Sequence, residues 1–431
     1  MRYVRINDHL IVADQPDLKT LASLKEEGFN QVVNLRPDGE NTSYPSHEQA
    51  AHTVAEMGLR YHYIPVTINT LTRADIRAFQ AVLHEKNGPV FAHCASGKRV
   101  MTLYVLGQIL DGHMHADDIL PFGRNYGFDL TEAVKWLEKE QERKLHVEGF
   151  FDKSTWSVQY ILIDPKTKHC AIIDPVWDYD EKSGTTSTEN ADKLLRYIHD
   201  NKLHLEWILD THPHADHFSA AHYLHEKTGA PTAIGVHVRD VQKLWKKLYN
   251  LPNLKTDGSQ WNHLFKEGDH FTIGSLKGRV LFSPGHTLAS VSYLVDDAVF
   301  VHDTIFMPDS GTARADFPGG DAKTLWRSIK EILALPKETR LFTGHDYQPH
   351  GRHPRWESTV GEQLRTNPHL KDMTKAAYVK LRQARDKTLP MPKLILHALQ
   401  VNIQGGRLPE PEDNGVSYLK IPLNTLRGTT E

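Results

Sequence analysis

Short apolar runs alternate with longer, helically spaced apolar segments along the first third of the chain. The runs 31–35 and 89–92 have the length and composition of buried strands. The largely apolar run 100–110 predicts a buried helix that ends near Gly112. This alternation predicts an α/β architecture for the first part of the chain.

A second helix is predicted from Asp129 onward, because one of its faces carries only apolar residues, namely Leu130, Ala133, Val134 and Leu137. It leads into the charged stretch 139–144, which we expect to be solvated and to form a linker. The pattern therefore predicts one domain over 1–144 and a second over 145–431.

Strand-like runs continue in the second domain at 158–163, 171–173 and 207–209, and they are mixed with helical segments. This mixture suits an α+β fold with layers of sheet and helix. One amphipathic segment, 241–249, is expected to pack on the core, and the alternative is a lid over a substrate.

The tail after Gln348 contains two more helical segments, at 376–385 and 393–400. They either complete the fold of the second domain or form a contact in a homo-oligomer. The sequence leaves both alternatives open.

Composition narrows the class of protein. A chain of 431 residues is long enough for about two or three domains. The net charge of -3, from 51 basic and 54 acidic residues, provides no field that attracts polyanions, so we expect no nucleic acid partner.

Neither an apolar leader nor a stretch approaching the roughly 20 apolar residues of a membrane span occurs in the sequence, so we expect a soluble cytoplasmic protein. The two cysteines, Cys94 and Cys170, lie far apart and in different predicted domains. They indicate a reducing compartment and not a disulfide scaffold, and Cys170 is expected to lie in the core.

The segment 211–217 carries the strongest chemical signal, because it follows the strand-like run 207–209 and contains His212, His214 and His217. Asp216 lies among them. Imidazoles on a loop that leaves a strand can converge on a metal ion, and a nearby carboxylate can join them or orient a ring. A metal site here needs partners from elsewhere in the chain.

Three candidates for these partners follow in order, namely His286, Asp303 and His345, and each closes another strand-like run. The ordered series of a His-x-His-x-Asp-His loop, a Gly-His, an Asp after a strand and a final Gly-His-Asp-Tyr resembles the metal-ligand series of the metallo-β-lactamase superfamily. The resemblance implies an αββα sandwich over about 148–350.

Two segments, 311–317 and 344–347, further resemble the persulfide dioxygenases of that superfamily. This resemblance implies one Fe(II) per chain, held by His212, His286 and Asp303, a ligand set that leaves coordination positions open. It also implies that glutathione persulfide is oxidised with O2 to sulfite and glutathione. Zn(2+) is the alternative metal.

The same resemblance implies that the remaining residues of the series surround the iron ligands without binding the iron; they are His214, Asp216, His217 and His345. In a two-metal hydrolase, these residues would instead help to hold a second ion. Arg314 and Tyr347 are expected to place the substrate, since an arginine fork suits a carboxylate of glutathione. His302 stands where the family usually has glycine, and we expect its side chain to face the core and not to crowd the site.

In the first domain, Cys94 leaves a predicted strand into a loop that opens a helix, a position where a thiolate or an anion is stabilised. Arg99 adds a forked donor for an oxyanion. The segment resembles the His-Cys-x-x-Gly signature of dual-specificity and tyrosine phosphatases, but only four residues separate Cys94 from Arg99 where those enzymes have five.

The shorter loop is closer to that of the rhodanese sulfurtransferases, which implies a persulfide carried on Cys94. The alternative is a buried structural cysteine beside a salt-bridged arginine. Asp38 is a candidate acid, but the turn signal 37–39 favours a structural role for it.

The whole chain is similar to the bacterial β-lactamase hydrolase-like proteins, in which a phosphatase-like or rhodanese-like domain precedes a persulfide dioxygenase domain. In such a fusion, sulfite from one domain could attack a persulfide on Cys94 of the other to form thiosulfate. Two other functions remain open. One is a two-metal hydrolase of a thioester or lactam, and the other is a sensor that binds persulfide or oxyanion at Cys94 without turnover.

Overall fold

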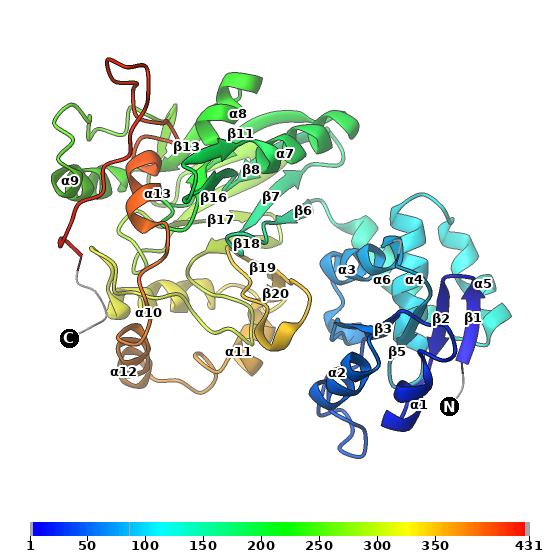
Figure 1. Ribbon diagram of the computed structural model, residues 1–431. Coiled ribbons are helices and arrows are strands. Elements are labelled where there is room, and N and C mark those ends of the chain that lie inside the picture. Colours follow the sequence, from blue (N-terminus) through cyan, green and yellow to red (C-terminus); the bar gives the residue numbers. More distant parts are fainter. Residues whose placement is uncertain (1–2, 86, 427–431) are drawn as a thin grey trace. The chain divides into compact units, whose positions relative to one another are not determined.

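The computed structural model describes residues 3–85 and 87–426, which form two compact units (Figure 1). The N-terminal unit comprises Met1–Arg143 together with Gln348–Arg355, and the metal unit comprises Lys144–Tyr347 and Trp356–Glu431. The chain therefore passes between the units after Arg143, after Tyr347 and after Arg355. We call the segment Gln348–Arg355 the strap.

The N-terminal unit is built on a five-stranded sheet. Its strands follow the order β1 (Tyr3–Asn7), β2 (Leu10–Ala13), β5 (Val90–His93), β3 (Gln31–Asn34) and β4 (Arg60–Tyr63). β1 and β2 are antiparallel, and the other neighbours are parallel. The sequence-based strands at 31–35 and 89–92 are thus confirmed as β3 and β5.

Helices cover both faces of this sheet. One apolar core includes residues of α3 (Arg73–His84), α4 (Lys98–Leu110) and α6 (Thr131–Glu142), and a second lies under α1 (Leu18–Ser23) and α2 (His47–Glu56). α5 (Ile119–Tyr126) packs at the edge of the first core. The predicted helix at 100–110 is α4, which begins two residues earlier because Gly97 turns the chain with φ of 78°.

The prediction of a solvated linker at 139–144 is wrong in part, because α6 continues through this stretch to Glu142. Glu140 is buried, with its carboxylate 3.4 Å from Nε of Arg73 and in contact with the guanidinium of Arg143. A buried carboxylate requires such partners, and this one fixes the end of α6 to α3.

The metal unit contains two six-stranded sheets. The first has the order β14 (His263–Phe265), β13 (Thr232–Gly235), β11 (His204–Leu209), β8 (His169–Ile173), β7 (Val158–Ile163) and β6 (His146–Phe151). The second has the order β15 (His270–Ile273), β16 (Leu276–Phe282), β17 (Val291–Val295), β18 (Ala298–His302), β19 (Arg340–Thr343) and β20 (Glu357–Thr359). A small third sheet joins β10 (Thr185–Ser187), β9 (Val176–Asp180) and β12 (Phe218–Ser219).

The two large sheets enclose one apolar core, to which strands of both contribute. α7 (Glu189–Asp200) and α8 (Ala221–Thr228) cover the outer face of the first sheet. α10 (Ala322–Ile332), α11 (Val360–Thr366) and α12 (Lys375–Asp386) cover the second. The expected αββα sandwich is confirmed, and α11 and α12 show that the tail helps to complete it.

α9 (Val238–Tyr249) and α13 (Ile395–Asn402) share a further apolar cluster. Val241, Trp245 and Tyr249 of α9 are buried there, so the helix packs on the core as expected, although Leu244 of the same helix is exposed. Cys170 is buried in β8 as predicted, and burial raises the pKa of its thiol to about 12. Within residues 3–85 and 87–426, no helix is long and apolar enough to span a bilayer.

Candidate functional site

The candidate metal ligands all follow the carboxyl ends of strands in the two facing sheets. The loop after β11 carries His212, and the loop after β16 carries His286. Asp303 directly follows β18, and His345 lies two residues after β19, the parallel neighbour of β18. Because these strand ends meet at one edge of the sandwich, residues more than 130 positions apart in the sequence converge.

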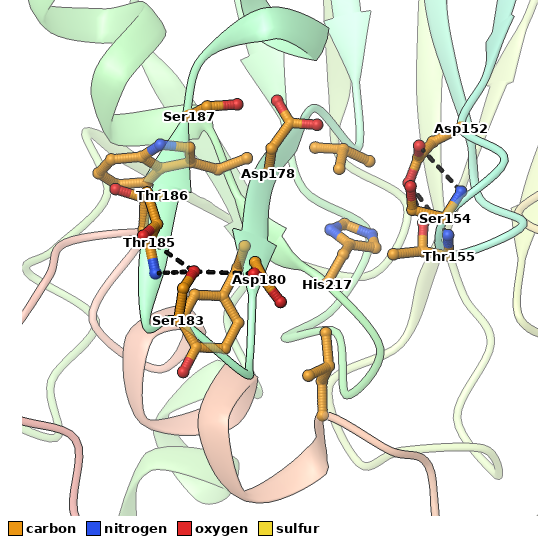
Figure 2. A pocket seen from close by; sticks show the side chains of 14 residues that line it. Asp152, Ser154, Thr155, Asp178, Asp180, Ser183, Thr185, Thr186, Ser187 and His217 are labelled. Carbon is orange, nitrogen blue, oxygen red and sulfur yellow. Dashed lines mark hydrogen bonds between the residues drawn. The ribbon is translucent and has the colours of Figure 1, made fainter.

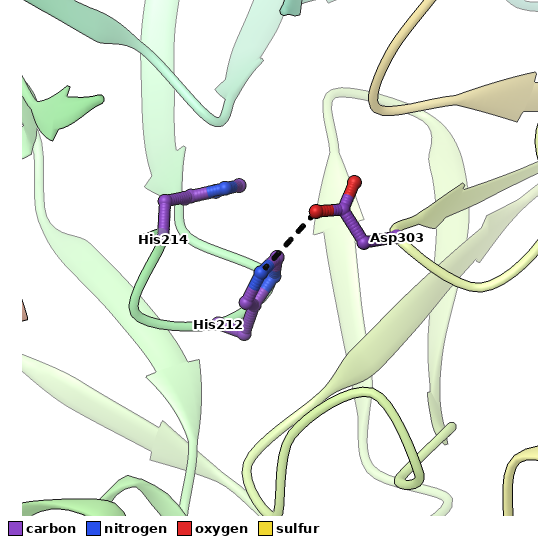
Figure 3. A group of neighbouring side chains, drawn as sticks. All are labelled: His212, His214 and Asp303. Carbon is purple, nitrogen blue, oxygen red and sulfur yellow. Dashed lines mark ion pairs between the residues drawn. The ribbon is translucent and has the colours of Figure 1, made fainter. Parts of the chain in front are cut away.

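The three predicted iron ligands lie together. Nε2 of His286 is 3.5 Å from Oδ2 of Asp303, and Nε2 of His212 is 3.8 Å from the same oxygen. Figure 3 shows His212 and His214 on their loop with Asp303 opposite them. All three predicted ligands are buried, so their polar atoms face one another away from bulk water.

Hydrogen bonds orient the two imidazole rings. Nδ1 of His286 lies 2.9 Å from the carbonyl oxygen of Arg314, which can only accept, so Nδ1 carries the proton and the Nε2 lone pair faces Asp303. Burial lowers the pKa of both His212 and His286, so both rings are neutral at physiological pH. A neutral imidazole with a free lone pair is the form that binds a metal.

A second group of side chains lies on the other side of Asp303. Nε2 of His345 is 3.4 Å from Oδ1 of Asp303 and 3.4 Å from Oδ2 of Asp216. Asp216 is in turn 4.0 Å from Nε2 of His217 and 4.0 Å from Nδ1 of His214. Asp303 therefore presents one carboxylate oxygen to each group, and the four further residues of the predicted series are all brought together.

The two groups differ in charge. Burial opposes protonation of His345, but Asp303 and Asp216 outweigh it and raise the pKa of this imidazole to about 10. Burial likewise opposes the charge on His214, and Asp174 raises its pKa to about 9. In the second group, His345 and His214 thus favour the protonated form, whereas burial lowers the pKa of His217 as it does in the first group.

Several atoms at this edge fit a bound cation. Nε2 of His212 is buried without a hydrogen-bond partner in the described part of the chain, and Oδ1 of Asp303 is buried there with only its ion pair to His345. Buried polar atoms are normally paired, and a divalent ion is a partner that satisfies imidazole and carboxylate together. The donor set of His212, His286 and Asp303 suits iron or zinc.

Asp174 is a site residue that the sequence analysis missed. Its carboxylate accepts hydrogen bonds from the backbone N–H and hydroxyl of Thr211, at 2.7 and 2.8 Å, and lies 3.1 Å from Nε2 of His214. It adopts a φ of 49°, which is strained for a residue with a side chain. Its position directly after the apolar strand β8 was the available signal, the same one that identified Asp303.

Asn402 at the end of α13 is a second such residue. Its side-chain amide donates to the carbonyls of His214 and His217, at 2.8 and 2.7 Å, and its oxygen accepts from the N–H of Ser219 at 2.8 Å. The tail therefore fixes the backbone of the histidine loop. No local pattern could reveal this, because 183 or more residues separate the partners.

The two predicted substrate residues lie beside the centre in different states. Arg314 donates to Asp316 at 2.7 and 2.8 Å and to the carbonyl of Pro390 at 2.6 Å, so its guanidinium is already engaged within the protein. Tyr347 is 51% exposed, and its ring stacks on that of His345 with centres 5.6 Å apart. Tyr347 is the one of the two that faces solvent.

His302 is buried as expected, but it also adjoins the metal group. Its Nε2 is 3.0 Å from Oγ of Ser283 and 3.2 Å from Oγ1 of Thr304, and its ring centre is 5.0 Å from that of His212. It holds a φ of 39°, which explains why glycine suits this position. Burial lowers the pKa of His302 to about 3, so it adds no charge beside the ligands.

A cavity of about 410 Å³ opens along the small sheet and reaches His217 (Figure 2). Its polar wall consists of Asp152, Ser154, Thr155, Asp178, Asp180, Ser183, Thr185, Thr186 and Ser187, and its apolar wall includes Trp177, Tyr179 and Leu394. Neither Arg314 nor Tyr347 belongs to this lining. The cavity gives a ligand of moderate size a way to approach the histidine loop.

The Cys94 loop has a different character. Cys94 is fully buried within the apolar core of the N-terminal unit. Both terminal nitrogens of Arg99 donate to the carboxylate of Glu40, at 2.7 and 2.6 Å, and one also donates to the carbonyl of Val66. In this conformation the loop corresponds to the structural alternative, a buried cysteine beside a salt-bridged arginine.

Asp38 occupies the predicted turn. Its carboxylate accepts from the backbone N–H of His47 at 2.9 Å and lies 2.6 Å from Nδ1 of the same residue, whose ring stacks on Tyr63. These contacts cap α2, which supports the structural role that the turn signal favoured.

Comparison with known proteins agrees with this division. Residues 2–111 match the phosphatase-like domain of the beta-lactamase hydrolase-like proteins, and residues 155–345 match the metallo-beta-lactamase superfamily. The chain is 62% identical over 430 residues to the beta-lactamase hydrolase-like protein of Agrobacterium fabrum, and the alignment covers 100% of both chains.

Other relatives match only part of this chain. Glyoxylase B2 of Dictyostelium discoideum is 51% identical over 66% of this chain and 99% of its own. The mitochondrial persulfide dioxygenase ETHE1 of Homo sapiens is 27% identical over 59% of this chain and 87% of its own. The crystal structure of ETHE1 from Myxococcus xanthus, at 30% identity, covers 61% of this chain and 100% of its own with a TM-score of 0.50.

The two domain matches correspond to the two units of the structure: the phosphatase-like match contains the Cys94 loop, and the metallo-beta-lactamase match contains the candidate metal ligands. The full-length match joins both in one protein. The chain therefore belongs to the beta-lactamase hydrolase-like proteins, in which a phosphatase-like domain precedes a domain of the metallo-beta-lactamase superfamily.

Proposed function

We propose that the metal unit is a persulfide dioxygenase that holds one Fe(II) through His212, His286 and Asp303. The observation that carries this proposal is the approach of two neutral imidazole Nε2 atoms to the same oxygen of Asp303, at 3.8 and 3.5 Å. Two imidazoles and one carboxylate on one face are the ligand set of iron oxygenases. The likeness to the human and Myxococcus xanthus ETHE1 proteins supports the choice of reaction.

In the proposed reaction, glutathione persulfide, O2 and water give glutathione and sulfite. His212, His286 and Asp303 would hold Fe(II), which would supply the redox chemistry with O2, and this ligand set would leave coordination positions open. Buried Asp303 stays ionised, because the positive charge of His345 outweighs the cost of burial and holds the pKa of this carboxyl well below its usual range. His345 thereby keeps a proton close to the reacting atoms, where it can stabilise the anionic product.

Aromatic side chains define the proposed approach of the substrate. Trp156 is exposed, its ring centre is 6.2 Å from that of Tyr347, and it adopts a φ of 58° that strains a large residue. Trp156 follows Thr155 of the cavity wall, and the next residue, Ser157, donates to Asp216 at 2.9 Å. This short segment therefore connects the cavity wall to the second group of candidate ligands.

For the N-terminal unit we infer a role as a carrier of sulfane sulfur on Cys94. The strand-to-helix loop and the guanidinium of Arg99 in the first turn of α4 support this role, because both stabilise anions. Transfer requires the loop to open, since the thiol is buried and Glu40 fills the fork of Arg99.

A two-metal hydrolase is the second candidate for the metal unit. It is favoured by Oδ1 of Asp303, which faces His345 and Asp216 in a group that could hold a second ion. Relatives named hydrolase-like or glyoxylase agree with this candidate. A persulfide or oxyanion sensor without turnover is the third, and steady-state turnover would exclude it.

Metal analysis of anaerobically purified protein, combined with oxygen uptake on glutathione persulfide, distinguishes these candidates. We expect one iron per chain and one O2 consumed for each sulfite formed. Two tightly bound zinc ions, with hydrolysis of a thioester or lactam and no oxygen uptake, would contradict the dioxygenase proposal.

A further inference from the structure

The orientation of His286 depends on a loop that has no regular secondary structure. The loop 311–317 lies between β18 and α10, and its carbonyl at Arg314 accepts the hydrogen bond from Nδ1 of His286 at 2.9 Å. The ring of Phe317 packs edge-on against the same imidazole, with centres 5.1 Å apart. Any shift of this backbone would move the acceptor that fixes the protonated nitrogen of His286.

Two buried charged residues of α12 fix the loop on both sides of this carbonyl. Nη1 of Arg382 donates to the carbonyl of Thr312 at 2.8 Å, and Oδ2 of Asp386 accepts from the N–H of Ala315 at 3.1 Å. Nε of Arg382 also donates to Oδ1 of Asp386 at 2.8 Å. The pair thus binds the residues two before and one after Arg314.

Neighbouring contacts also hold the first part of the loop. Tyr378 of α12 meets the hydroxyl of Thr312 at 3.0 Å, and Nδ1 of His369 accepts from the N–H of Thr312 at 3.1 Å. A Cβ on Gly311 would lie 2.4 Å from the ring of His369, so the chain is tightly enclosed there. Asp386 holds the N–H of Ala315, which belongs to the same peptide unit as the Arg314 carbonyl. The Arg314 side chain adds support through Asp316 and the carbonyl of Pro390. Arg382 and Asp386 are thus the contacts from α12 that fix the backbone on both sides of this carbonyl.

We propose that Arg382 and Asp386 are positioning residues for the metal centre, acting through the loop 311–317 on the tautomer and direction of His286. This inference rests on the proposed ligand role of His286. It also means that the C-terminal extension influences the geometry of the metal centre, although α12 itself supplies no candidate ligand. Residues that orient a metal-bound imidazole typically change metal affinity by about tenfold to a hundredfold when they are altered.

The test uses the full-length chain with Arg382→Met, Asp386→Leu and the double variant. Each single variant leaves one buried charge unpaired and can unfold the protein, whereas the double variant removes both charges with side chains of similar volume. Arg385→Met on the exposed face of the same helix is the matched control. The probe is Zn(II), added to metal-free protein in competition with a chromophoric chelator.

A second readout, the ¹⁵N signals of His286 in metal-free protein, reports which ring nitrogen carries the proton. For the folded double variant we expect Zn(II) affinity about tenfold to a hundredfold weaker and a mixture of His286 tautomers, with Arg385→Met unchanged. Wild-type affinity together with wild-type His286 signals in the double variant would overturn the inference. If His286→Ala itself leaves the affinity intact, the assignment of His286 as a ligand fails instead.

Discussion

Two loops that leave buried strands, 211–217 after β11 and 94–99 after β5, carry similarly reactive residue types but have opposite environments. Around the first, Nε2 of His212 and Oδ1 of Asp303 are buried without a hydrogen-bond partner in the described residues. In the second, Glu40 occupies the fork of Arg99 and the thiol of Cys94 is enclosed by the core. The polar atoms of the first loop face one another and fit a bound ion, whereas the ion pair of Arg99 with Glu40 closes the fork that an oxyanion would use.

The N-terminal unit also depends on a segment from much later in the sequence, whereas the candidate metal ligands all come from the metal unit itself. The metal unit supplies its own ligands, but the N-terminal unit includes the strap, which comes from between β19 and β20. In the strap, Nε of Arg355 is 3.0 Å from the buried carboxylate of Asp75, and Nε2 of His353 is 3.1 Å from Nδ1 of His62. A fragment that ends at residue 143 therefore lacks part of its own unit.

The largest expected effect concerns the unpaired atoms of the metal loop. His286→Ala should remove iron and lower oxygen uptake by more than about a hundredfold, because it deletes one of three ligands, and should spare any chemistry at Cys94. Metal content and oxygen electrode rates measure both effects. His199→Ala, an exposed histidine of α7, is the control. Retained iron and uptake in His286→Ala would break the contrast between the loops.

Removal of the strap contact should come next in size. Arg355→Met leaves the buried carboxylate of Asp75 without its cation, which typically costs about 3–5 kcal/mol. Hydrogen exchange of α3 should rise in this variant, while exchange in β11 and β18 stays at the wild-type level. Exposed Arg124 in α5 provides the control variant Arg124→Met. Equal protection of α3 in wild type and Arg355→Met would show that the strap contributes no stability.

A smaller effect should follow from opening the Cys94 loop. Glu40→Gln removes the carboxylate from Arg99 and should accelerate modification of Cys94 by an anionic reagent a few-fold, as expected for a partly exposed ion pair. The rate with iodoacetate is compared with that of neutral iodoacetamide, and Cys94→Ser gives the background. If both reagents gain equally, Glu40 acts as a steric cover and not as a competing anion.

The smallest expected effect is kinetic coupling between the two activities. Sulfite that attacks a persulfide on Cys94 forms thiosulfate and regenerates the thiolate, and a shared chain raises the effective concentration to about millimolar. At micromolar protein, wild type should therefore show a shorter lag in thiosulfate formation than an equimolar mixture of Cys94→Ser and His286→Ala chains. These variants keep the strap, unlike separated domains. Identical lags would favour two independent activities under common control.

The sequence by itself determined most elements and the ligand series. Hydrophobic spacing located β3, β5, β7 and β11, because strand and helix periods differ and each was present locally. His212, His286, Asp303 and His345 could be found since each closes a strand-like run, and strand ends are where a sandwich brings side chains together. The αββα arrangement came from resemblance, because local spacing does not specify how strands pair.

Only the tertiary structure decided which groups those ligands contact and which reactive residues are closed off. Asp174, Asn402 and the Arg382–Asp386 pair act through partners that are 37 to 188 residues away, and no periodic pattern encodes such pairings. The burial of Cys94 and the capture of Arg99 by Glu40 likewise depend on packing between distant segments. Hydrophobic periodicity records which face of an element is buried, whereas the partner that a polar group finds is set by the three-dimensional approach of the chain.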